Sequence, residues 1–146
     1  MKFFKKKIYS WDEHERCFFE INNNEEIKLN SLYCIEKQKE ILLKNTILFA
    51  QNKLFNHALL WGARGTGKSS LIVSVFYQII KSYDISLLEI KRNQIKHINS
   101  ILRNFDKTNQ KFIIFCDDFS FSSQNEDFIL FKNILDGTVS KNPNLV

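Results

Sequence analysis

Residues 62–69 carry the residue types that bind the phosphates of a nucleotide. The segment is Gly-Ala-Arg-Gly-Thr-Gly-Lys-Ser, which fits the pattern G-x-x-x-x-G-K-[ST] at every fixed position. Glycines at such positions let the backbone curl, so that successive N–H groups point at phosphate oxygens. The lysine then places an ammonium beside the β- and γ-phosphates, and the following hydroxyl binds Mg²⁺. We therefore expect this loop to bind a nucleoside triphosphate with magnesium.

Each position of this loop has an expected role. Phosphate contacts are expected from the loop and the residue after it, namely Gly62, Ala63, Arg64, Gly65, Thr66, Gly67, Lys68, Ser69 and Ser70. Lys68 is also expected to act in catalysis by stabilising charge on the phosphates, and Ser69 is expected to ligate the metal. The alternative is a glycine-rich turn without a ligand. It is disfavoured because three of the chain's four glycines lie within six positions here.

A pair of acidic residues follows an apolar run further along the chain. Phe112 to Cys116 predicts a buried strand, and Asp117 and Asp118 come directly after it. A nucleotidase of this kind needs a carboxylate at the tip of a neighbouring strand to hold magnesium. We expect Asp117 to contact the metal, directly or through water, and Asp118 to orient or deprotonate an attacking water. The alternative is that the two acids only open a turn, where acidic residues are common.

These two motifs need elements that bring them to one place, and the hydrophobic pattern predicts such elements. Apolar runs predict strands at 58–61, 85–90 and 112–116, and helical spacing of apolar residues predicts helices at 35–54, 68–82, 94–105 and 128–135. Alternating strands and helices indicate a parallel sheet covered on both faces, with ligands at the carboxyl ends of the strands. Both motifs lie at such ends. The expected fold class is therefore α/β.

The residues before the first predicted helix have a weaker pattern. Short strands are predicted at 8–11 and 17–21, and a turn is predicted at 22–24, before the first predicted helix. The chain has 146 residues, of which 44% are hydrophobic and 25% charged. These values are ordinary for a globular protein and suit a single domain.

The cysteines and the net charge limit which cellular compartment and which binding partners the sequence favours. Three scattered cysteines favour a reducing compartment over a disulfide framework or a zinc site. No apolar run is long enough for a signal peptide or a membrane span, so we expect a cytoplasmic protein without membrane contact. The net charge of +5 permits nucleic-acid binding. The basic residues are spread along the chain apart from Lys5-Lys6-Lys7, however, so a nucleic-acid partner is possible but unsupported.

With these motifs the chain resembles the AAA+ class of P-loop ATPases, and within that class the bacterial ATP-binding proteins grouped as domain of unknown function 815. The resemblance rests on Leu59 to Ser70, on Leu88-Glu89-Ile90 and on Phe112 to Phe121. It implies a three-layer P-loop NTPase sandwich with a parallel sheet, and Mg-ATP as the ligand. It further implies a partial AAA+ core with Walker A and Walker B at 33–146, preceded by an N-terminal extension at 1–32.

The resemblance also implies roles for residues outside the two motifs. In AAA+ proteins the adenine lies near the segment that leads into the first helix, here Tyr33 and Cys34. The family often has glycine where Cys34 stands. Aspartate is usual in the family at the second acidic position, as at Asp118. AAA+ proteins commonly assemble into rings, which implies a homo-oligomer for the complete protein.

Some elements implied by the resemblance have no counterpart in this sequence. AAA+ enzymes continue with a sensor strand, an arginine finger and a helical lid, whereas the sequence stops at Val146, where the sensor strand would begin. We therefore expect the lid and later strands to be absent, and ATP hydrolysis to belong to the complete protein. Two alternatives stay open. One is a nucleotide-binding fragment without turnover, and the other is a P-loop kinase or GTPase, although the sequence has no Asn-Lys-x-Asp guanine motif.

Overall fold

A four-stranded sheet forms the centre of the molecule, which we describe from a computed structural model. The structure describes residues 6–21, 27–105, 110–117, 129 and 132. The strands lie in the order β2-β1-β3-β4, and their bounds are β1 Ile8–Asp12, β2 Cys17–Glu20, β3 Ile85–Ile90 and β4 Lys111–Cys116. The β1–β3 and β3–β4 pairs are parallel, and the β1–β2 pair is antiparallel. The protein is therefore mixed α/β with a mostly parallel sheet.

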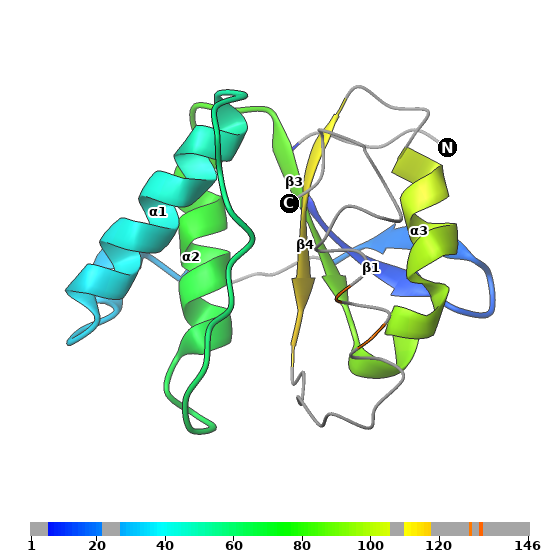
Figure 1. Cartoon of the computed structure of the whole chain (residues 1–146), viewed down its shortest axis with the longest axis horizontal. Helices are drawn as coiled ribbons and strands as arrows, with labels where there is room; N and C mark the ends of the chain where they lie inside the picture. Colours follow the sequence, from blue (N-terminus) through cyan, green and yellow to red (C-terminus); the bar gives the residue numbers. More distant parts are fainter. Residues whose placement is uncertain (1–5, 22–26, 106–109, 118–128, 130–131, 133–146) are drawn as a thin grey trace.

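Helices cover both faces of this sheet (Figure 1). The helix α1, Glu36–Ala50, and the helix α2, Lys68–Ile79, pack together on one face, while α3, Ile98–Phe105, lies on the other. Two 3₁₀-helices, η1 at Leu29–Ser31 and η2 at Arg92–His97, precede α1 and α3. Because both faces are covered, β3 is buried along nearly its whole length, as its continuous apolar sequence requires.

Most of the predicted elements are confirmed. The strands at 85–90 and 112–116 form, as do the two short strands before residue 22 and the helices that begin near residues 35 and 68. The predicted helix at 94–105 begins instead as the 3₁₀-helix η2. There the buried Gln94 side chain accepts a hydrogen bond from the Lys91 backbone at 2.9 Å and donates one to the Trp11 carbonyl at 2.8 Å. One bond within the turn and one to a residue 83 positions away hold a tighter turn than helical spacing alone predicts.

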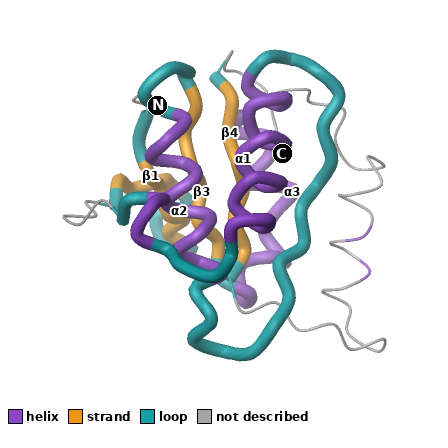
Figure 2. Tube along the Cα trace, turned by 90° about the vertical axis from the view of Figure 1, so that its left-hand side faces the viewer, coloured by secondary structure: helices purple, strands orange, loops and turns teal. Residues whose placement is uncertain are grey.

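One prediction about the sheet is wrong, and one feature of the sheet was not predicted. The expected parallel pairing is confirmed for β3 with β4, whereas the antiparallel pairing of β1 with β2 was not predicted. The predicted strand at 58–61 is a loop without strand pairing, within the long connection between α1 and α2 (Figure 2). Its apolar side chains are not buried on two faces as expected: Leu59 is 62% exposed and Trp61 is 88% exposed.

A pair of asparagines explains where this connection runs. The Asn45 side chain, on α1, donates to the Asn56 carbonyl at 2.7 Å and accepts from the Asn56 N–H at 3.0 Å. The Asn45 side chain thereby pairs with both backbone polar groups of Asn56 and holds this point of the connection against α1. Residues 57–61 therefore begin beside α1 and not beside β4. A local hydrophobic pattern does not predict such hydrogen bonds between a helix and the connection that follows it.

Several predictions lie outside the described residues. These are the turn at 22–24, the role of Asp118 and nearly all of the helix predicted at 128–135. Residues 8–20, which belong to the predicted N-terminal extension, supply β1 and β2 to the same sheet as β3 and β4. In the part of the chain that the structure describes, no helix has the length and apolar character needed to cross a membrane.

Candidate phosphate-binding site

The loop at 62–69 has a backbone conformation that only glycine adopts readily. Gly62, Gly65 and Gly67 have φ angles of 143°, 79° and 82°, in the region where a side chain meets the neighbouring backbone. A Cβ atom added at Gly65 or Gly67 would have no heavy atom within 4 Å. These two positions therefore need glycine for the path of the backbone and not for lack of space.

This path ends at the beginning of α2. Gly67 is the N-cap residue of the helix, in the left-handed conformation, and no side chain caps this end. The first N–H groups of a helix have no intrahelical partner, and the helix dipole places partial positive charge there. An anion such as a phosphate group satisfies both features at once.

The side chain of Lys68 is folded onto the loop. Its Nζ donates to the carbonyl of Gly62 at 3.1 Å and to that of Ala63 at 2.7 Å. The Thr66 hydroxyl donates to the same Ala63 carbonyl at 2.9 Å. The ammonium is thus held inside the curve of the loop, at the N-terminus of α2, where it adds a full positive charge to the partial charge of the helix.

The next residue connects the loop to the sheet. The Ser69 hydroxyl, in the first turn of α2, donates a hydrogen bond of 2.9 Å to Oδ2 of Asp117, the residue directly after β4. The two predicted metal-binding residues are therefore in contact. Asp118, the predicted catalytic base, lies outside the described residues.

The chemistry of this pair fits magnesium. A hydroxyl and a carboxylate supply two hard oxygen ligands, and Mg²⁺ commonly binds to one or two protein oxygens and completes its shell with phosphate oxygens and water. Among the described residues no group of three or more His, Cys, Asp or Glu side chains forms a metal site. The donor set suits a cation that arrives with a phosphate ligand better than a fully protein-bound metal.

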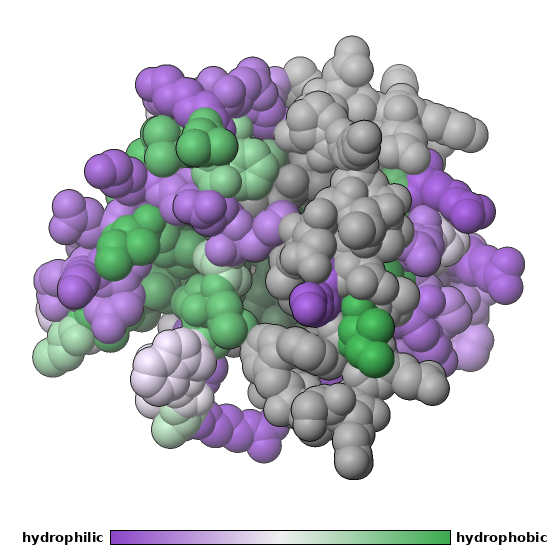
Figure 3. All heavy atoms as spheres, in the orientation of Figure 1, coloured by the Kyte–Doolittle hydropathy of each residue, from purple (hydrophilic) through white to green (hydrophobic). Residues whose placement is uncertain are grey.

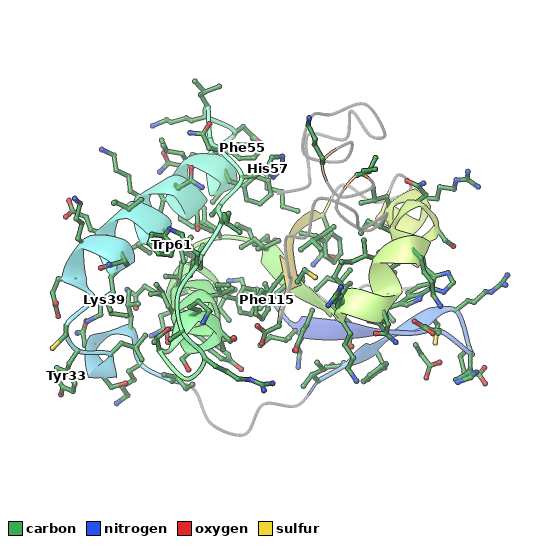
Figure 4. The ribbon with its side chains drawn as sticks, turned by 60° about the horizontal axis from the view of Figure 1, so that its bottom comes forward. Tyr33, Lys39, Phe55, His57, Trp61 and Phe115 are labelled. Carbon is green, nitrogen blue, oxygen red and sulfur yellow. The ribbon has the colours of Figure 1, made fainter. Side chains whose placement is uncertain are left out.

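A cavity of about 730 Å³ adjoins the loop. Gly62, Arg64, Lys68, Ser69 and Asp117 line its polar end. The rest of its wall comes from α1, α2, the connection and β4, and is mainly apolar (Leu42, Ala58, Leu59, Leu60, Trp61, Ile72, Val75, Ile113, Ile114 and Phe115). Figure 4 shows Trp61 on the connection and Phe115 on β4, the two elements that bound this space.

The two residues expected to contact adenine lie away from this cavity. Tyr33 is 79% exposed, and neither Tyr33 nor Cys34 lines the cavity. Figure 4 shows Tyr33 near the beginning of α1, well separated from Phe115. Cys34 has a φ of 62°, a conformation that favours glycine. The adenine role of both residues stays a prediction.

Lys111 positions β4, the strand that Asp117 follows, and the sequence motifs did not point to it. Its Nζ donates to the carbonyls of Phe49 and Ala50 at 3.1 and 2.6 Å, at the C-terminal end of α1. Partial burial lowers the pKa of this lysine below its ordinary value. A cation at a helix C-terminus is favourable, so Lys111 attaches the start of β4 to α1.

The described residues thus form a mixed α/β structure with a mostly parallel sheet, in which a glycine-rich loop, a helix N-terminus and a serine–aspartate pair lie together. Residues 5–146 match the model of the family described as Protein of unknown function (DUF815), and the chain belongs to that family. No curated protein matches the chain, and no solved structure does.

Proposed function

We propose that this chain binds Mg-ATP through the loop at 62–69, as the nucleotide-binding module of an AAA+-type P-loop ATPase. The observation that carries the proposal is the 2.9 Å hydrogen bond between Ser69 and Asp117. The two residues were expected from sequence to hold one metal ion, and chain folding brings them together from positions 48 residues apart. A glycine-rich turn without a ligand has no need of a carboxylate at its side.

The proposed binding mode uses groups that are already in place. The β- and γ-phosphates take the anion site at the N-terminus of α2, where the loop N–H groups and Lys68 neutralise their charge. Lys68 then exchanges the Gly62 and Ala63 carbonyls for phosphate oxygens. Ser69 and Asp117 would hold magnesium from the protein side, and the ion would supply positive charge to the phosphates.

Hydrolysis is proposed for the complete protein. In that proposal Lys68 stabilises the charge that develops on the transferred phosphoryl group, and Asp118 orients or deprotonates the attacking water. Helices on both faces of a mostly parallel sheet support the three-layer P-loop NTPase sandwich. The choice of ATP over GTP rests on the resemblance to AAA+ proteins.

Equilibrium binding of ATP in the presence and absence of Mg²⁺ tests the proposal. Lys68→Ala should remove detectable binding, while Lys53→Ala, a matched loss of an exposed lysine outside the cavity, should leave affinity unchanged. Equal affinity in the wild type and Lys68→Ala would reject the proposal. Competition with GTP separates the ATPase from the GTPase alternative, and phosphate release over many turnovers separates an ATPase from a fragment that only binds.

A further inference from the structure

The segment 91–105, which forms η2 and α3, carries positive charge and no acidic residue. Its four cations are Lys91, Arg92, Lys96 and Arg103, and without any Asp or Glu they give it a net charge of +4 with histidine neutral. On α1, by contrast, lysines alternate with glutamates, as is usual on a solvent-exposed helix face. The charge of this segment is therefore unlike that of an ordinary exposed helix.

Folding turns these cations away from the core. The apolar side chains of η2 and α3 are only 0–4% exposed (Ile95, Ile98, Ile101 and Leu102). The four cations are exposed, as are the polar residues among them, Asn93, Asn99 and Ser100. Lys96 and Arg103 are seven residues, or about two helical turns, apart, so both project from the outward side. Lys91, Arg92, Lys96 and Arg103 thus form one basic surface.

The basic surface is separate from the phosphate-binding loop. Figure 1 shows α3 on the opposite face of the sheet from α1 and α2, and Figure 3 shows hydrophilic side chains along this side of the molecule. None of the four cations lines the cavity beside the loop. Acidic residues adjoin the η2 end, because Gln94 donates to the Trp11 carbonyl and the turn after Trp11 holds Asp12, Glu13 and Glu15. Arg103, in the last turn of α3, lies at the other end.

The chemistry of the basic surface suits a row of phosphate groups. A helix that lies on a membrane needs an apolar side toward the lipid, whereas the apolar side of α3 is buried in the core. Single-stranded nucleic acid is bound largely by stacking on aromatic side chains. None of the large hydrophobic residues exposed in the described part of the chain belongs to 91–105. Cations and hydrogen-bond donors without an aromatic platform fit a duplex backbone better.

We propose that the basic surface binds the phosphate backbone of double-stranded DNA without sequence preference. From Arg92 to Arg103 it extends roughly 20 Å, and DNA presents one phosphate charge about every 1.7 Å of its axis. The major groove of B-DNA admits an α-helix, whereas that of A-form RNA is too narrow for side chains to reach its bases. This inference goes beyond the proposed function and does not depend on it.

The salt dependence of binding to a short labelled duplex of mixed sequence tests the proposal. Fluorescence anisotropy with the full chain measures the affinity without nucleotide. Three or four phosphate contacts should reduce the affinity roughly 40- to 150-fold between about 50 and 200 mM salt. A wild-type chain that does not bind the duplex at low salt would overturn the inference and leave the proposed function as it stands.

Two double variants with the same loss of charge locate the binding surface. Lys96→Gln/Arg103→Gln should weaken binding at low salt by at least about tenfold and reduce the slope of log affinity against log salt by about 2. Lys37→Gln/Lys44→Gln, a pair of exposed lysines also seven residues apart but on α1, should retain nearly the wild-type affinity. Circular dichroism checks that both variants are folded. An equal loss in the two variants would mean that net charge alone attracts DNA, and would overturn the proposed surface.

Competing ligands separate the remaining alternatives. Tighter binding of the single strand or of duplex RNA would overturn the choice of double-stranded DNA, and tighter binding of polyglutamate would assign the surface to an acidic protein segment. Saturating Mg-ATP should leave the affinity for DNA unchanged. Displacement of DNA by Mg-ATP would show that DNA phosphates occupy the loop at 62–69, which overturns the inference while supporting the proposed function.

Discussion

The Ser69 hydroxyl and the Asp117 carboxylate form a hydrogen bond of 2.9 Å between the first turn of α2 and the end of β4. A hydrogen bond to a charged acceptor contributes about 1.5–3 kcal/mol when both partners are in place. The pair therefore links a helix to the sheet. Under the proposed function the same two oxygens turn to a metal ion, so one contact serves stability in one state and ligand binding in the other.

Asp117→Asn should make ATP binding insensitive to magnesium. The amide keeps a hydrogen-bond acceptor for Ser69 but loses the charge that attracts the cation, and we expect a loss of at least about tenfold in affinity with Mg²⁺, or 1.4 kcal/mol. Titration of ATP with Mg²⁺ or with EDTA measures the effect. Glu40→Gln, a matched change of an exposed acid on α1, is the control. A Mg²⁺ dependence that survives in Asp117→Asn would argue against this metal site.

Gly67→Ala should weaken both the fold and phosphate binding, whereas Gly67→Asn should retain more of each. The φ of 82° at this N-cap position costs a residue with a Cβ about 1–2 kcal/mol, and asparagine tolerates such angles better than alanine does. No atom stands within 4 Å of the added Cβ, so the cost is one of backbone conformation. Urea unfolding and ATP titration of both variants measure it. Equal stability of Gly67→Ala and the wild type would contradict this account.

Cys34→Gly should stabilise the protein by roughly 0.5–1 kcal/mol. Relief of the left-handed conformation at φ 62° gains about 1–2 kcal/mol, and the greater freedom of glycine in the unfolded chain returns about half of that gain. The expected rise in thermal midpoint is about 1–4 °C, measured by circular dichroism. Cys34→Ala keeps the strained conformation and serves as the control. A variant with glycine that melts no later than the alanine variant would rule out strain at this position.

His57 should make the fold less stable as the pH falls. Its ring packs edge-on against Phe55, at 6.4 Å between ring centroids (Figure 4), and partial burial lowers its pKa below the ordinary value of 6.5. The unfolded state then binds the proton more readily than the folded state. Stability is therefore retained above pH 6.5 and declines below it until the pH has passed the folded-state pKa.

Urea unfolding of the wild type and His57→Gln at pH 7.5 and pH 5.5 checks this prediction. The loss of stability on acidification should be smaller in His57→Gln, because glutamine does not titrate. An identical loss in the two proteins would assign the pH dependence to other groups. His57 also lies next to the segment 58–61, so repeating the comparison with Mg-ATP reports whether its surroundings change when ligand binds.

The features that could be predicted from sequence are those whose pattern lies within a short segment of the chain. The loop at 62–69, the strands that became β3 and β4 and the helix α2 each carry their pattern within a dozen residues. Ser69 and Asp117 could be paired in advance because the positions of loop and strand end follow from a parallel α/β arrangement. The left-handed conformation of Cys34, with a φ of 62°, was not predicted.

The features that could not be predicted depend on distant contacts. The pattern at 58–61 is that of a strand, but the Asn45–Asn56 bonds direct the chain away from the sheet. Lys111 bonds to the end of α1 across 61 residues, and no periodicity marks it. Likewise, nothing in the sequence of β1 shows that it pairs with β3 rather than only with its neighbour β2.

The parallel pairing of β1 with β3 has a consequence for how the chain acquires its structure. Ile8 lies opposite Leu87, and the flanking Lys7 N–H donates to a Ser86 hydroxyl 79 residues away, at 3.5 Å. During synthesis β1 emerges before β3 and can form its hairpin with β2, but its pairing with β3 must wait until β3 has left the ribosome. Closing so long a loop carries a large entropic cost before any contact rewards it. We expect this step, and not the formation of the helices, to set the folding rate, with the exposed edge of β1 vulnerable to aggregation until it is complete.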